Sequence, residues 1–184
     1  MTKGNIKELS FDRDTHTYYY HGRRLNGVTR AIAGRLQKNF PVGLAKVQVM
    51  TSYGTQVHKE VEDYIDTGIY PVSEQGKWIA EYLDPYLVDG FVLTEVKVSD
   101  FENTASSVDV VAVTKDGIVL FDIKTGNFDR SYCTLQLNAY RLMYENCYNS
   151  KVVALKVINS KTKKVFDIKF CDDTQVLKLL ARNV

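Results

Sequence analysis

Cysteine and long hydrophobic runs are both scarce in this sequence. Its 184 residues include three cysteines. Cys133, Cys147 and Cys171 are odd in number, widely spaced and without a C-x-x-C pair, which favours free thiols in a reducing compartment over a disulfide or zinc framework. The N-terminus has no apolar signal core, and no later run approaches membrane-spanning length. We therefore expect a cytoplasmic protein that makes no contact with a membrane.

An excess of charge of one sign is lacking too. The chain has 24 basic and 22 acidic residues, so any binding of nucleic acid must come from locally placed charge. Hydrophobic residues make up 45% and charged residues 25%, which is typical of a globular protein with a real core. We predict one domain over residues 1–184, with an N-terminal hairpin and helix over 1–41 and a core over 42–184.

The spacing of apolar residues predicts a mixed α/β order. Residues 16–29 are expected to form two short strands around a turn at His21 and Gly22. A short helix is expected to follow from Thr29 to about Leu36, with residues 39–41 as its break. Gly54 is a candidate interruption of the next helix. The remaining prediction comprises helices over 42–65, after Ser73, over 132–147 and over 174–180, and strands over 91–99, 107–114, 118–124, 152–158 and 165–170.

Acidic residues interrupt two of the apolar strands. Asp109 lies in SVDVVAV, and Asp122 lies with Lys124 in LFDIKTG. A carboxylate buried without a partner costs several kcal/mol, so something must compensate each acid. If the strands pair through the turn at 115–117, the two acids fall at similar height, and a stagger or bulge decides whether they share a face. Converging carboxylates suit Mg²⁺ or Mn²⁺, whereas a lone D-x-K motif favours a structural ion pair.

Other polar residues accompany these acids at helical or strand spacing. His58 and Glu62 lie one helical turn apart, as do Gln136 and Tyr140. An ordinary amphipathic helix edge explains either pair alone. Glu95, in LTEVKVS, either supports a metal site from outside or lies on the exposed side of a half-buried strand.

Taken together, four motifs resemble the RecB-type, phage exonuclease-like branch of the PD-(D/E)xK nuclease superfamily. They are G-T-x-x-H at 54–58, Asp109 within a strand, D-I-K-T-G at 122–126 and Q-L-x-x-Y at 136–140. The resemblance implies a restriction-endonuclease-like core, in which helices flank a central mixed β-sheet. It also implies a Mg²⁺- or Mn²⁺-dependent deoxyribonuclease, an exonuclease before an endonuclease, that leaves 5′-phosphate and 3′-hydroxyl ends in DNA end processing, recombination or repair.

The resemblance also assigns roles by position. By this resemblance, the metal ligands are His58, Asp109, Asp122 and the Ile123 carbonyl. The catalytic residues are Lys124, Asp122, Asp109, Gln136 and Tyr140. Glu62 and Glu95 would stabilise the metal site without binding the ion. Lys124 would position the attacking water. Some relatives carry an iron–sulfur cluster on four cysteines, but the three cysteines here do not match that spacing, and we expect no cluster.

Two alternatives stay open at this point. The chain could be a non-catalytic DNA-binding or assembly module built on a nuclease fold, because a fold does not fix a function. It could also be a structural domain in which the acids and Lys124 form only an ion network. The nuclease interpretation implies DNA as partner, single- or double-stranded, in a bacterial or phage-infected host cytoplasm. It leaves room for a homo-oligomer or for a helicase or recombination partner.

Overall fold

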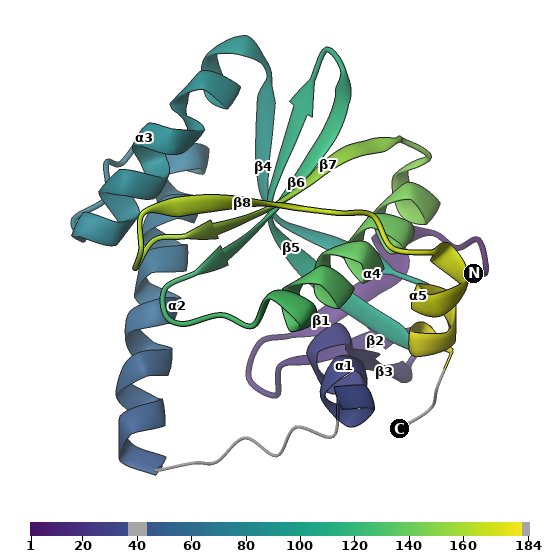
Figure 1. Ribbon diagram of the computed structural model, residues 1–184. Coiled ribbons are helices and arrows are strands. Elements are labelled where there is room, and N and C mark those ends of the chain that lie inside the picture. The colour runs from purple at the N-terminus through teal and green to yellow at the C-terminus, as the bar shows by residue number, and fades with distance from the viewer. Residues whose placement is uncertain (37–43, 182–184) are drawn as a thin grey trace.

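The computed structural model describes residues 1–36 and 44–181, with side chains described for 1–32 and 52–181. Figure 1 shows a twisted sheet with helices on both of its faces. Every helix among the described residues is too short or too polar to cross a membrane. The strands are β1 (Leu9–Asp12), β2 (Thr17–Tyr20), β3 (Arg23–Gly27), β4 (Phe91–Ser99), β5 (Thr104–Thr114), β6 (Gly117–Lys124), β7 (Val152–Asn159) and β8 (Lys164–Ile168). The helices are the 3₁₀ turn η1 (Ile6–Glu8), α1 (Val28–Leu36), α2 (Leu44–Thr67), α3 (Glu74–Asp89), α4 (Arg130–Tyr148) and α5 (Asp173–Leu180).

The eight strands form one mixed sheet. Its order is β1-β2-β3-β5-β6-β7-β8, and β4 pairs with β5 beside this path. The pairs β3–β5 and β6–β7 are parallel, and the other pairs are antiparallel. The α/β class with a central mixed sheet flanked by helices, as expected of a restriction-endonuclease-like core, is confirmed.

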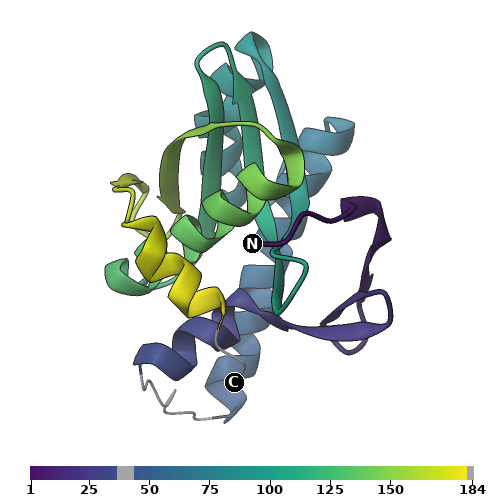
Figure 2. The ribbon, with the colours of Figure 1, turned by 90° about the vertical axis from the view of Figure 1, so that its right-hand side faces the viewer.

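Two apolar layers hold the helices on the sheet. On one face, α1, α4 and α5 bury residues such as Ile32, Leu137 and Leu179 against it. On the other face, α2 and α3 bury residues such as Val61 and Ile79. Figure 2 shows α4 and α5 in front of the sheet, with α2 and α3 behind it. The sheet is therefore covered on both faces, and polar side chains within it need a specific reason.

Most of the predicted elements are present, with three differences. Gly54, a candidate interruption, does not break its helix, since α2 runs through that residue. The strand β1 and the turn η1 were not predicted. The helix break before Pro41 falls outside the described residues. The N-terminal hairpin joins the core sheet through the pairs Asn26↔Thr104 and Gly27↔Ala105.

Gly90 marks a close approach between the end of α3 and the sheet. A Cβ atom at this position would lie 2.3 Å from the Val113 carbonyl oxygen. We predict that Gly90→Ala lowers the free energy of unfolding by about 3 kcal/mol, because backbone cannot yield as a flexible side chain does. Urea denaturation measures this change. Gly27→Ala is the matched control, since a Cβ atom there meets nothing within 4 Å, and an equal loss in both variants would contradict the explanation.

Candidate metal centre

The central strands β5 and β6 separate partway along their length. Their ladder runs from Thr114↔Gly117 to Val110↔Phe121 and ends there. Beyond this point β6 stays paired with β7, and β5 stays paired with β4. Figure 1 shows the two strands diverging below the centre of the sheet. We call this opening the fork, and its first residues are Asp109 on β5 and Asp122 on β6.

Asp109 closes the base of the fork with its side chain. The register of the ladder would place Asp109 opposite Asp122. Instead, Asp109 Oδ2 accepts a hydrogen bond of 2.7 Å from the Ile123 amide. The carboxylate thus replaces a backbone partner that Ile123 loses where the strands part, which satisfies a donor inside the sheet.

The neighbouring strand β4 is kinked at the same level. In a regular strand Val92 and Val96 would point to the same face, but Val92 packs with α2 and α3 and Val96 with α4. Between them, Glu95 has a φ of 47°, a left-handed conformation that is rare for a residue with a side chain. On β5, Val108 packs in the layer of α4, whereas Val110 packs in the layer of α2 and α3, so the strand changes face at Asp109. Such backbone costs about 1–3 kcal/mol and is concentrated at functional sites.

The kink brings three metal-type ligands together. His58 of α2, Glu95 and Asp109 each offer one ligand atom, and these atoms lie within 4.8 Å of one another. His58 Nδ1 lies 3.8 Å from Asp109 Oδ2. Although the Glu95 side chain is exposed, desolvation of its carboxylate and the charge of Asp109 raise its pKa to about 7. One imidazole and two carboxylates form a donor set that fits Mn²⁺ or Mg²⁺, and a cation would relieve the repulsion between the acids.

Asp122, expected as a metal ligand, lies outside this cluster and is paired with Lys124. Its side chain is 2% exposed, and Lys124 Nζ lies 2.7 Å from Oδ2 and donates to Oδ1 at 2.9 Å. The buried Oδ2 has no well-aligned hydrogen bond and so retains capacity to accept one. The ion pair that the D-x-K motif alone favours is therefore present beside the three-ligand cluster.

Lys124 carries a fixed positive charge at neutral pH. Burial acts to lower its pKa, but the negative charges of Asp122 and Asp109 outweigh burial and raise it. Burial also raises the pKa of Asp122, against the opposing effect of Lys124. A lysine held in its protonated form cannot accept a proton from water. Its chemistry is to orient and stabilise negative oxygen atoms.

The Q-L-x-x-Y motif holds Lys124 from α4. Lys124 Nζ donates to Gln136 Oε1 at 3.3 Å, and Gln136 Nε2 donates to the Tyr140 hydroxyl at 2.8 Å. The Ser106 hydroxyl donates to the same Tyr140 oxygen at 3.3 Å. Gln136 and Tyr140 are both buried. The chain of hydrogen bonds from Asp122 to Ser106 thus fixes the ammonium group in the fork.

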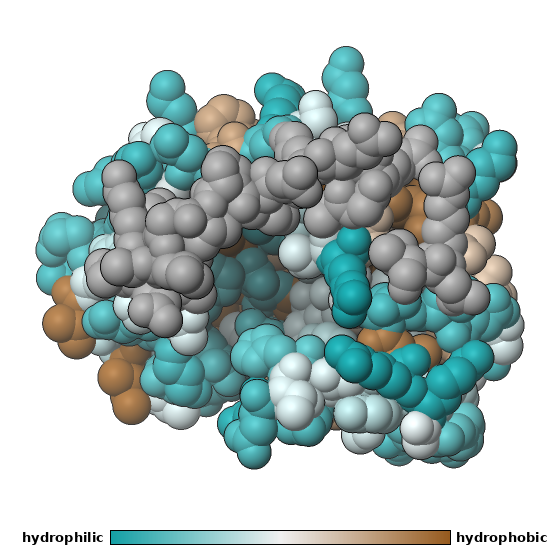
Figure 3. Space-filling view, turned by 90° about the horizontal axis from the view of Figure 1, so that it is seen from below, coloured by the Kyte–Doolittle hydropathy of each residue, from teal (hydrophilic) through white to brown (hydrophobic). Residues whose placement is uncertain are grey.

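Gly54 allows α2 to approach this site. A Cβ atom at Gly54 would lie 3.1 Å from Thr125 Oγ1, which is tight for any side chain. The first motif therefore contacts the D-I-K-T-G motif directly, and His58 lies one turn further along the same helix. Seen from below, the molecule is hollowed near its centre, and the coloured residues along the lower rim of the hollow are mostly hydrophilic or neutral (Figure 3).

The remaining sequence assignments fall in different places. Glu62 forms an ion pair of 3.2 Å with Lys59 on α2 and lies outside the ligand cluster. Glu95, for which support of the site and an exposed strand position were both open, is one of the three clustered ligands. The sequence showed Glu95 as an acid in an apolar strand, but its position depends on the kink. The Ile123 carbonyl remains a prediction as a metal ligand.

Tyr140→Phe tests the hydrogen-bond chain without a change of volume. Loss of the hydroxyl leaves the buried Gln136 amide unpaired, so we expect the free energy of unfolding to fall by about 1–3 kcal/mol. Tyr144→Phe is the matched control on the same helix. The Tyr144 hydroxyl has no hydrogen bond to any residue that the structure describes, and its removal should cost far less. If thermal denaturation gave equal losses of stability for the two variants, the hydrogen bonds of Tyr140 would make no specific contribution to stability.

Comparisons with known proteins assign no family to the chain. No family model matches it, and no curated protein matches its sequence. Among solved structures, it is similar to the one described as the crystal structure of SSO0001, with 15% sequence identity and a TM-score of 0.36 over 83% of this chain and 80% of that chain. A TM-score this low supports no statement about fold or function.

Proposed function

We propose that the protein is a Mg²⁺- or Mn²⁺-dependent DNA nuclease. It hydrolyses phosphodiester bonds to leave 5′-phosphate and 3′-hydroxyl ends, preferentially from DNA ends, in end processing, recombination or repair in a bacterial or phage-infected cytoplasm. The observation that carries the proposal is the fork itself. Three clustered metal-type ligands lie near a half-buried lysine that hydrogen bonds keep in position.

A purely structural ion network explains only part of this arrangement. Lys124 compensates the buried Asp122. Within the described residues, however, no lysine or arginine forms an ion pair with Glu95 or Asp109. Two neighbouring carboxylates and an imidazole without a cationic partner are best explained by a divalent cation. The left-handed Glu95 backbone, which is costly, has a purpose if its side chain binds that cation.

The residues of the fork divide the work of hydrolysis. His58, Glu95 and Asp109 would hold the cation, which supplies Lewis acidity toward phosphate and an activated water. Lys124 would donate hydrogen bonds to that water or to a non-bridging phosphate oxygen, where negative charge grows during attack. Asp122 keeps Lys124 protonated, and Gln136 fixes the direction of its ammonium group.

The chemistry of the products tests the proposal. Purified protein incubated with DNA and Mn²⁺ or Mg²⁺ should release products that carry a 5′-phosphate and a 3′-hydroxyl, and mass spectrometry of the products identifies both ends. Chelation with EDTA should stop the release. Binding of DNA without cleavage under any metal condition would instead support the non-catalytic DNA-binding or assembly module.

Glu95→Gln tests the ligand that the geometry adds. We expect this variant to bind Mn²⁺ at least tenfold more weakly, because an amide is a poorer ligand than a carboxylate. Isothermal titration calorimetry measures the affinity. Glu62→Gln makes the same change just outside the cluster and should bind Mn²⁺ nearly as well as the native protein. If the two variants behave alike, Glu95 is not a ligand.

A further inference from the structure

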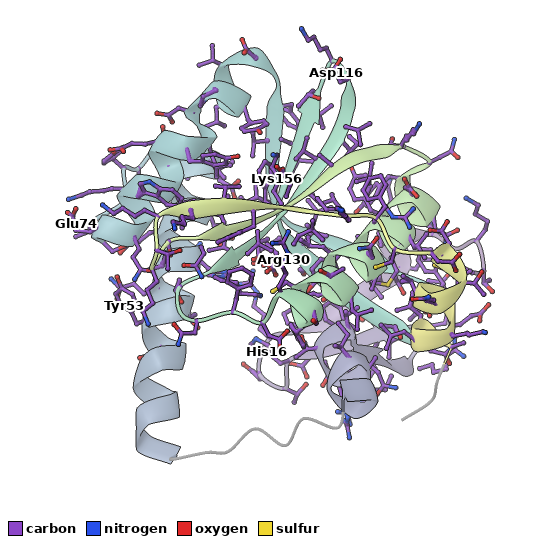
Figure 4. All side chains as sticks on the ribbon, viewed as in Figure 1. His16, Tyr53, Glu74, Asp116, Arg130 and Lys156 are labelled. Atoms are coloured by element: carbon purple, nitrogen blue, oxygen red, sulfur yellow. The ribbon has the colours of Figure 1, made fainter. Side chains whose placement is uncertain are left out.

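A pocket lies between the N-terminal hairpin and α1. Its volume is about 450 Å³, and its walls include Phe11, His16, Tyr18, Arg24, Arg30 and Ser106. Figure 4 shows His16 near the foot of the sheet, on the side of α1. The volume falls within the range of pockets that hold one small organic molecule. It suits a single nucleotide and is too small to admit a base-paired duplex.

One wall of the pocket is a fixed aromatic platform. The rings of Phe11 and Tyr18 have centroids 4.5 Å apart, and the His16 ring meets Phe11 edge-on at 5.5 Å. The Tyr18 hydroxyl lies 3.0 Å from Ser107 Oγ, which anchors the ring to β5. Preorganised aromatic rings of this kind bind nucleobases by stacking, whatever the base sequence.

Two arginines add positive charge to the lining of the pocket. Arg24 on β3 and Arg30 in the first turn of α1 both line the pocket and are exposed. Neither forms an ion pair with any residue that the structure describes. A guanidinium group binds phosphate through two parallel hydrogen bonds. The pocket thus combines stacking surface for a base with cations for its phosphate, although the whole chain carries a net charge of only +2.

The pocket is connected directly to the fork. Ser106 lines the pocket, and its hydroxyl donates to Tyr140, which in turn holds Gln136 beside Lys124. Ser107, the anchor of Tyr18, lies two residues before Asp109 on β5. Three successive hydrogen bonds therefore link the wall of the pocket to the Lys124 ammonium group.

We infer that this pocket binds one unpaired nucleotide of the DNA strand that is cut. The base stacks on Phe11 and Tyr18, and the flanking phosphates pair with Arg24 and Arg30. The inference rests on the proposed nuclease function for its ligand, and it makes a single-stranded segment beside the scissile bond the preferred substrate.

Binding without cleavage tests the pocket. Fluorescence anisotropy in EDTA measures the affinity of a labelled oligothymidylate of about 12 nucleotides. The double variant Arg24→Gln/Arg30→Gln should bind at least tenfold more weakly, and the slope of log affinity against log salt should fall by about 0.7 per arginine. Phe11→Leu should weaken binding about fivefold or more through loss of stacking.

The control removes the same charge elsewhere. Lys115→Gln/Lys151→Gln alters two lysines at the opposite end of the sheet, where Asp116, the neighbour of Lys115, lies in Figure 4. This variant should bind within about twofold of the native protein. An equal loss in both double variants would overturn the inference, because the effect would then come from net charge alone. So would an equal loss of affinity for a blunt duplex, since the pocket would then contact only its backbone.

Photochemical crosslinking gives a positive readout. An oligonucleotide with 5-iodouracil should crosslink to Phe11, His16 or Tyr18 in peptide mass spectrometry, and crosslinks confined to other segments would overturn the assignment. The outcomes also separate the two proposals. Pocket variants that lose single-strand binding in a protein without cleavage activity would support the pocket and contradict the nuclease. Pocket variants that bind and cleave DNA like the native protein would support the nuclease and contradict the pocket.

Discussion

Asp109→Asn is expected to reduce metal-dependent cleavage about 100-fold or more. The amide oxygen of asparagine can still accept the hydrogen bond from Ile123, so the fork and the fold should persist. What is lost is a negative ligand within the cluster with His58 and Glu95, and loss of a group that tunes a metal site already costs 10–100-fold in affinity or activity. Cleavage rates over a range of Mn²⁺ concentrations, together with calorimetric Mn²⁺ binding, measure the effect.

Asp63→Asn is the matched control for this variant. Asp63 lies on α2 and forms an ion pair of 2.8 Å with Lys59, outside the ligand cluster. Its replacement should leave Mn²⁺ affinity and cleavage nearly unchanged. Native-like Mn²⁺ binding by Asp109→Asn would show that the cluster is not the metal site.

Lys124→Met is expected to lower kcat by about 10²–10³-fold, because a fixed charge beside the reacting phosphate is lost. Mn²⁺ affinity should change little, since Lys124 is not a ligand. This contrast with Asp109→Asn separates the two roles. Single-turnover cleavage at saturating Mn²⁺ measures the chemical step, and calorimetry measures the metal. Loss of Mn²⁺ binding in Lys124→Met would show that the two sides of the fork do not act separately.

The same variant should also destabilise the fold, in a way that depends on pH. Breaking a buried ion pair costs about 3–5 kcal/mol, because Asp122 is left as an uncompensated charge. Burial raises the pKa of Asp122 above its unfolded value, so the folded state binds the proton more tightly. The penalty is therefore fully present at high pH and shrinks as the pH falls through the folded pKa. The double variant Asp122→Asn/Lys124→Met should regain stability and remain inactive, which distinguishes lost catalysis from lost folding.

The sequence predicted much of the fold because apolar periodicity survives in most of its elements. Strands such as β4 and β6 and the helix α4 carry clear patterns, and their bounds agree closely with the structure. The strand β1 spans only Leu9–Asp12, too short for a pattern to emerge. The pairing of β3 with β5 links residues far apart in the chain through two residue pairs, and no local signal indicates it.

The candidate site was predictable in its residues but not in its geometry. Counting residues around the turn placed Asp109 and Asp122 at similar height, and the register, continued one pair beyond Val110↔Phe121, agrees. The count could not show that the strands part just there, so that Asp109 turns to the Ile123 amide and Asp122 to Lys124. The position of Glu95 depends on a left-handed backbone, which the residue type itself disfavours.

Cleavage of linear, nicked and closed circular DNA by the native protein, with Mn²⁺, with Mg²⁺ and with EDTA, is the most direct test of the fork as a metal-dependent catalytic centre. We predict degradation of linear DNA with either metal, none with EDTA, and slower attack on closed circles. Lys124→Met should cleave every form about 10²–10³-fold more slowly than the native protein. Cleavage that persists in EDTA, or that Lys124→Met performs at the native rate, would contradict the account.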